Sequence, residues 1–144
     1  MVGYGSARGK RQEGKERRGR WVIVSKGGFR ELLVWQKSKE LAIAVYRIAN
    51  EGELSRDFGL REQMRRAAVS ICSNIAEGDE RETDKESVRF FYIAKGSAAE
   101  LIAQLEIAAG VGYLQQAEAA QIQLACEEIS KMLRGLINAR SIST

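Results

Sequence analysis

The stretch RRAAVSICSNIAEG, residues 65–78, decides the fold of this chain. Its apolar residues, together with the preceding methionine, recur at steps of three and four, which is the spacing of one face of a helix. They are Met64, Ala67, Ala68, Ile71 and Ile75. Ser70, Asn74 and Glu77 recur in the same way on a neighbouring face, and Gly78 is expected to end the helix in the left-handed conformation. The pattern predicts a packing helix with a polar stripe and contains no recognisable active site.

The composition limits the classes of protein to which the chain can belong. Its 144 residues suffice for one domain, and an apolar content of 44% with 29% charged residues is typical of a globular protein. Proline is absent, which favours uninterrupted helices because a proline in a helix interior costs about 3 kcal/mol. Histidine is also absent, so the commonest general base and metal ligand is missing. We therefore expect neither an enzyme nor a bound cofactor or metal.

The sequence patterns also bear on location. No apolar run approaches the roughly 20 residues that a membrane span needs, and no secretory signal pattern is recognisable. Cys72 and Cys126 lie on separate predicted helices, as expected of buried free thiols in a reducing compartment. We therefore expect a cytoplasmic protein without a membrane partner.

Helical periodicity extends through four segments. They are expected at about residues 29–50, 55–77, 83–110 and 115–139, with Ser55 and Thr83 as N-caps. Because the links are short, neighbouring helices should be antiparallel. We predict an all-α fold, an up-down-up-down four-helix bundle of residues 29–139 followed by a tail of residues 140–144. Gly96 lies inside the third helix at a cost of about 1 kcal/mol relative to alanine, which predicts that another helix approaches it closely.

The first 28 residues differ from the rest in charge and composition. They hold seven of the fourteen glycines and eight Lys or Arg against two acids, a net charge of +6 that leaves −2 for the remainder. Such a segment buries too little apolar surface to offset its ordering entropy, so residues 1–28 are expected to be a disordered basic tail, with Trp21–Val24 loosely packed or extended. Two interpretations of residues 1–23 stay open. They are either translated sequence upstream of a natural start near Val24, or a basic arm that binds nucleic acid.

Three segments together resemble a known family. They are VWQKSKELA at residues 34–42, FGLREQMRRAAVSICSNIAEG at 58–78 and RFFYIAKGSAAELIAQLEIAAGVGYL at 89–114. In order and spacing they are similar to the bacterial four-helix-bundle proteins named for open reading frames in 23S ribosomal RNA intervening sequences, over roughly residues 29–137. The chain departs from that pattern at residues 50–53, where many members have Phe-Pro and this sequence reads Asn-Glu-Gly-Glu.

The resemblance implies a set of motif residues and an assembly. The motif positions correspond here to Arg66, Ser70, Asn74, Glu77, Gly78, Gly96, Ser97 and Glu100. Members of the family are homo-oligomers, often five-fold rings, and generally lack a defined biochemical activity, whereas a related group serves as accessory factors of reverse transcriptases. A homo-oligomer, most simply a pentamer, is also favoured by the run Phe90–Ile93, whose four apolar residues cannot all face one bundle core.

The motif residues allow two interpretations. They form either a functional pocket or a polar stripe that fixes helix register, since a buried polar group has to be hydrogen-bonded. We favour the structural interpretation, with an ion pair between Arg66 and Glu100. The acidic run of residues 79–86 is interpreted as a solvated helix entrance rather than a cation site, because it lacks the ligand pattern of a calcium loop.

A basic face on the first two predicted helices is the candidate nucleic-acid contact. It consists of Lys39, Arg47, Arg61 and Arg65. In a ring the phosphate contacts of each subunit would add up, although few aromatic residues for base stacking lie nearby, namely Trp35, Tyr46 and Phe58. Two functions therefore stay open: a non-enzymatic oligomeric module that binds RNA, DNA or a nucleic-acid-processing protein, and a protein–protein scaffold without nucleic-acid contact.

Overall fold

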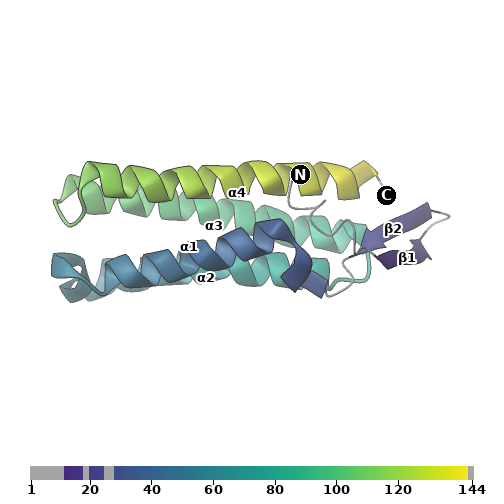
Figure 1. Ribbon diagram of the computed structural model, residues 1–144, viewed down its shortest axis with the longest axis horizontal. Helices are drawn as coiled ribbons and strands as arrows, with labels where there is room; N and C mark the ends of the chain where they lie inside the picture. Colours follow the sequence, from purple (N-terminus) through teal and green to yellow (C-terminus); the bar gives the residue numbers. More distant parts are fainter. Residues whose placement is uncertain (1–11, 18–19, 25–27, 143–144) are drawn as a thin grey trace.

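The computed structural model describes residues 12–17, 20–24 and 28–142 (Figure 1). Four long helices form the molecule: α1 (Leu33–Ala49), α2 (Phe58–Asp79), α3 (Asp84–Gly110) and α4 (Gln116–Ile142). Two short 3-10 helices accompany them, η2 (Gly28–Glu31) before α1 and η3 (Gly52–Arg56) between α1 and α2. The predicted all-α four-helix bundle is confirmed.

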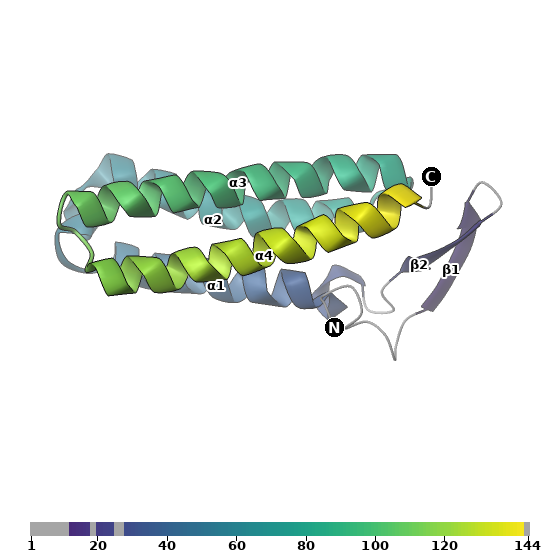
Figure 2. The same ribbon diagram turned by 90° about the horizontal axis from the view of Figure 1, so that it is seen from above.

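The four helices are arranged in a cycle in which each contacts the next, and α4 closes the cycle against α1. Figures 1 and 2 show that the links lie at alternate ends of the bundle, so that consecutive helices run in opposite directions. The core between them is apolar. Its largest fully buried side chains include Met64, Ile71, Ile75, Phe91, Leu101 and Leu105. Burying each such side chain stabilises the fold by roughly 1.5–3 kcal/mol. Met64, Ile71 and Ile75 are among them, so the helix face predicted from residues 64–75 is the core face.

Side chains cap the N-termini of α2 and α3, although one of these caps differs from the prediction. Thr83 caps α3 as expected, since its Oγ1 accepts from the backbone N–H of Glu86 at 3.2 Å. For α2 the predicted cap Ser55 is wrong. Ser55 lies inside η3, where its hydroxyl donates to the Gly52 carbonyl at 2.6 Å, and Asp57 caps α2 instead. The reason is that η3 occupies the first residues of the predicted helix and delays its start.

The close helix approach predicted from glycine occurs at a different glycine. Gly96 is exposed, and a Cβ placed there would meet no atom within 4 Å. Gly78 is buried, and a Cβ placed there would lie 2.6 Å from the Phe91 ring of α3. Gly78 is also not the left-handed end of α2, because the helix continues to Asp79 and positive φ among the described glycines is confined to Gly28, Gly52 and Gly112. The lack of a side chain at Gly78 is therefore what allows α2 to pack this closely on the Phe91 ring.

Where the structure describes them, the predicted tails agree with expectation only in part: Trp21–Val24 is extended, which was one of the two expected arrangements. Strands β1 (Gln12–Arg17) and β2 (Arg20–Val24) pair antiparallel inside the segment expected to be disordered. The reason is the β-propensity of the run Trp21–Val24. The rest of that prediction lies outside the described residues. At the other end α4 continues to Ile142, so most of the expected C-terminal tail is helical.

Candidate functional site

The polar stripe of α2 forms hydrogen bonds to α3. Ser70 Oγ and Ser97 Oγ lie 2.7 Å apart and join the two helices. The Asn74 amide donates to the Ser70 carbonyl at 2.8 Å and to Ser70 Oγ at 3.0 Å. These hydrogen bonds join the three side chains across the contact of α2 with α3, which is the geometry of a contact that fixes helix register.

The other motif residues lie apart from this contact. Arg66, Glu77, Gly96 and Glu100 are all exposed. Glu77 accepts from Arg81 at 2.7 Å, four residues further on and just beyond the end of α2. The ion pair expected between Arg66 and Glu100 is not formed: both residues are described and exposed, and their charged groups do not come within 4.0 Å of each other. The motif is therefore not one constellation: Ser70, Asn74 and Ser97 come together, Gly78 packs on Phe91, and four members remain on the surface.

A buried ion pair that the sequence analysis missed lies at the end of α2. Arg140 Nη2 is 2.9 Å from Asp79 Oδ1, and each side chain is only 4% exposed. The guanidinium of Arg140 also lies over the Phe91 ring, 5.4 Å from its centroid. Nearby, the Ser87 hydroxyl donates to the Gly78 carbonyl at 2.6 Å. The pair is separated by 61 residues in the sequence, and Arg140 had been placed in a tail, so no local pattern could have revealed it.

Among the described residues, the acidic run of residues 79–86 shows no grouping of side chains that would bind a metal ion. Across the described residues, no three His, Cys, Asp or Glu side chains gather as metal ligands would. Asp84 of this run is buried at the start of α3, whereas Glu80, Glu82 and Glu86 are exposed. A cation site is therefore not proposed.

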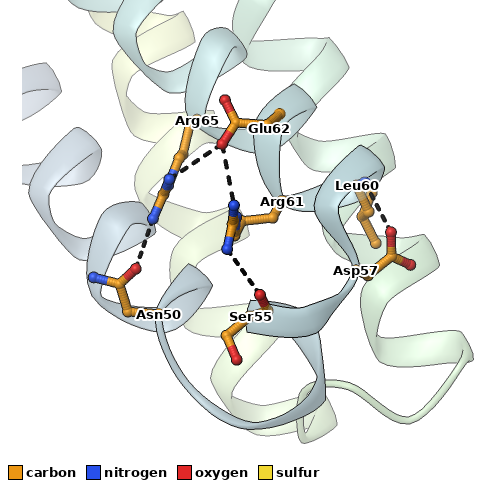
Figure 3. A network of polar contacts seen from close by, with 7 residues as sticks. All are labelled: Asn50, Ser55, Asp57, Leu60, Arg61, Glu62 and Arg65. Atoms are coloured by element: carbon orange, nitrogen blue, oxygen red, sulfur yellow. Dashed lines mark hydrogen bonds and ion pairs between the residues drawn. The ribbon is translucent and has the colours of Figure 1, made fainter.

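Two of the four candidate nucleic-acid contacts, Arg61 and Arg65, lie on α2 and hold the link between α1 and α2 by hydrogen bonds (Figure 3). Arg65 donates to Asn50 Oδ1 at 2.6 Å and to Glu62 Oε2 at 3.1 Å. Arg61 donates to the Ser55 carbonyl at 2.8 Å and lies 3.6 Å from the same Glu62 carboxylate. One carboxylate thus serves two guanidinium groups, which join α2 to the end of α1 and to η3. Their charges are partly neutralised by these contacts.

The other two candidates, Lys39 and Arg47, are placed differently. Both are exposed on α1, and within residues 28–142 neither forms an ion pair at 4.0 Å or less. Lys39 Nζ lies 5.8 Å from the centroid of the Trp35 ring. Arg47 stands on the ridge between two grooves that flank α1, and it lines both of them. These two cations remain available to an anionic partner.

The first groove lies between α1 and α2 and has a volume of about 580 Å³. Its lining contains two cations and no carboxylate, and most of its surface is apolar. The lining residues are Phe29, Trp35, Lys39, Ala42, Ile43, Tyr46, Arg47, Asn50, Val69, Cys72, Ser73 and Ala76. Burial raises the pKa of the Cys72 thiol, an effect that Ser38 and Lys39 partly oppose, so the thiol adds no negative charge at neutral pH. Phe29, Trp35 and Tyr46 gather here although the sequence analysis counted the aromatic residues as few.

The second groove lies between α1 and α4 and has a volume of about 450 Å³. Its floor is apolar, but its rim holds three carboxylates and two cations. The charged lining residues are Lys37, Glu40, Arg47, Glu118 and Glu128. Lys37 Nζ and Glu128 Oε1 lie 3.6 Å apart and bridge the two helices. This groove therefore carries excess negative charge and suits a phosphate-containing ligand poorly.

The sequence model of the family described as 23S rRNA-intervening sequence protein matches residues 30–135, so the chain belongs to this family. A solved structure with a similar fold is described as a protein with unknown function from the S23 ribosomal protein family of Bacteroides thetaiotaomicron. It is 25% identical with a TM-score of 0.67, and the similarity covers 73% of this chain and 98% of that one. No curated protein matches the chain. The predicted family is thus confirmed.

No helix in the part of the chain that the structure describes is long and apolar enough to cross a membrane.

Proposed function

We propose that this protein is a non-enzymatic homo-oligomer, most simply a closed ring of five subunits, that binds RNA or DNA or a protein that processes nucleic acid. The observation that carries the nucleic-acid part is the groove between α1 and α2, whose lining has two cations and no carboxylate. Cationic grooves with aromatic side chains are what proteins use to follow a nucleic-acid backbone. The absence of histidine from the sequence supports a binding role over catalysis.

Self-association is supported by large apolar side chains that the bundle leaves exposed outside this groove. Tyr92 and Ile93 on α3 are 57% and 42% exposed, and Leu124 on α4 is 65% exposed. Phe91 of the same run is buried, so the consecutive apolar residues are divided between the core and the surface. Exposed apolar patches of this kind often mark protein interfaces, and a head-to-tail contact between different patches closes into a ring.

The oligomer is tested by light scattering on the purified full chain at micromolar concentration. A mass of several subunits is expected, and Tyr92→Glu with Ile93→Glu should lower it because two charges would be buried in the contact. The matched control is Arg66→Glu, which makes the same change of −2 in net charge at an exposed position of α2. A monomeric parent protein would contradict the proposal.

Nucleic-acid binding is tested by fluorescence anisotropy with a labelled 20-nucleotide RNA and its DNA counterpart. The logarithm of the affinity should fall linearly with the logarithm of salt concentration, because bound cations of the nucleic acid are released. No binding of either at 50 mM salt would contradict this part of the proposal.

The alternative function is a protein–protein scaffold, and it is favoured by the mostly apolar surface of the same groove. Purification of the tagged protein from its native host, with analysis of both RNA and protein, distinguishes the two functions. RNA that remains after washing at high salt supports the first function, whereas co-purified protein without RNA supports the scaffold.

A further inference from the structure

We infer that the groove between α1 and α2 binds single-stranded nucleic acid, with its bases stacked on the rings of Tyr46 and Trp35 and its phosphates on Lys39 and Arg47. The inference rests on the nucleic-acid part of the proposed function and adds to it a site and a strand type.

Rings and cations follow one another along the part of α1 that lines the groove. Trp35, Lys39, Tyr46 and Arg47 all line the groove. At a rise of 1.5 Å per residue, the eleven residues from Trp35 to Tyr46 span about 16 Å. Bases stacked at about 3.4 Å per nucleotide would place roughly five nucleotides over this length, which is within the usual range for single-strand binding sites.

Each aromatic ring of the groove has a cation beside it. Arg65 lies over Tyr46 at 4.8 Å from the ring centroid, and Lys39 lies over Trp35 at 5.8 Å. At the end of the groove Arg30 lies 4.9 Å from the Phe29 centroid. Tyr46 remains 42% exposed in spite of Arg65, so its ring is accessible to a base. A chain that presents one base and one phosphate per unit matches such paired rings and charges.

The apolar floor distinguishes a single strand from a duplex. Ala42, Ile43 and Val69 form part of the lining, and they offer surface to an exposed base but nothing to a phosphate. A duplex keeps its bases stacked inside and would contact only Lys39 and Arg47. The second groove has a similar apolar floor but three carboxylates, which repel the phosphates of single strands and of duplexes alike. The first groove combines an apolar surface with three aromatic rings and two cations, and its lining holds no carboxylate. A hollow on α3 also has two cations and no carboxylate, but it holds one ring rather than three.

Base stacking is tested at Tyr46 in the full chain, by anisotropy with 12-nucleotide oligouridylate and oligothymidylate and with a 12-base-pair duplex. Tyr46→Leu keeps apolar surface but removes the ring, and should weaken single-strand binding roughly five- to hundredfold. Tyr46→Phe keeps the ring and should bind within about twofold of the parent. Duplex binding should be the same for all three proteins, because a duplex offers no free base faces.

Phosphate contact is tested by charge reversal. Lys39→Glu with Arg47→Glu should weaken single-strand binding and reduce the slope of log affinity against log salt by at least about 1.4, the value for two lost contacts at 0.7 each. The matched control, Lys131→Glu with Arg134→Glu, makes the same change in net charge at exposed positions on α4. The control should retain the slope of the parent protein. Thermal melting of each variant shows that the bundle remains folded.

Four outcomes would overturn the inference. If the parent protein binds nucleic acid but Tyr46→Leu and the Lys39/Arg47 variant behave like the control, the proposed function stands and the site lies elsewhere. If Tyr46→Leu weakens duplex and single-strand binding equally, bases are not stacked on the ring. If the groove variants lower the mass measured by light scattering, the groove is an interface between copies of the chain. Absence of any binding by the parent would remove the proposed function as well.

Discussion

The two ends of the bundle join their helices by different kinds of polar contact (Figures 1 and 2). At the end with the α2–α3 link, Asp79 and Arg140 form an ion pair in which both side chains are 4% exposed. At the end with the α1–α2 link, Arg61 and Arg65 share the Glu62 carboxylate, and all three side chains are 20–34% exposed. Removing one partner of a buried pair leaves an uncompensated charge, whereas water replaces a lost partner at the surface. The first end should therefore be far more sensitive to substitution.

The largest effect is expected from Arg140→Met. This change keeps much of the apolar stem but leaves the Asp79 carboxylate buried without its guanidinium, which should lower the free energy of unfolding by about 3–5 kcal/mol. Urea denaturation measures the loss. Adding Asp79→Leu to this variant removes the stranded charge and should recover a large part of it. A loss below about 1 kcal/mol for the single variant would show that water reaches the pair.

The next largest effect at the same end is expected from Gly78→Ala. The new Cβ would lie 2.6 Å from Phe91 Cε1 and 3.1 Å from Phe90 Cβ, so the ring has to move in a packed core. Such overpacking typically costs about 1–3 kcal/mol. Gly96→Ala is the matched control, since it meets no atom within 4 Å and should be neutral or stabilising by up to about 1 kcal/mol. Thermal melting of both variants would reveal an error in the packing if their order were reversed.

A smaller effect is expected at the opposite end from Arg65→Gln. The variant loses an ion pair to Glu62 and one charge-assisted bond to Asn50, both partly exposed, and should change the free energy of unfolding by at most about 1 kcal/mol. A double-mutant cycle with Glu62→Gln isolates the pair itself. A coupling energy comparable to that of Asp79 with Arg140 would remove the distinction between the two ends.

The smallest effect is a pH dependence at this second end. The Tyr113 hydroxyl donates to Asp57 at 3.0 Å, and this bond raises the pKa of Tyr113 above its ordinary value of 10.0. Because the folded state holds the proton more tightly than the unfolded state, the stabilisation is complete below pH 10 and is lost as pH rises above it. The difference in melting temperature between the parent and Tyr113→Phe should therefore shrink above pH 10. A difference that stays constant to pH 11 would mean that the bond does not form.

The candidate site was only partly predictable from the sequence, and the reasons differ among its residues. Lys39, Arg47, Arg61 and Arg65 could be named as exposed basic side chains because helical periodicity places them away from the core. The contact of Arg65 with Glu62 spans three residues on one helix, so a local signal existed. The contact of Arg65 with Asn50 spans fifteen residues and depends on how α1 meets α2. The groove itself depends on how α1 and α2 pack against each other, which no spacing encodes.

By itself the sequence determined the four helices, the cap at Thr83, the core face of residues 64–75 and the family, because periodicity, capping and motif order are properties of neighbouring residues. The tertiary structure decided which glycine is crowded, since another helix lies close to Gly78 but not to Gly96. It also decided that Arg140 belongs to Asp79, and that Lys39 and Arg47 stay unopposed while Arg61 and Arg65 do not. Each of these outcomes depends on the rotation and distance of one helix relative to another. That arrangement is set by packing the whole core at once, so it cannot be deduced from any single stretch of the chain.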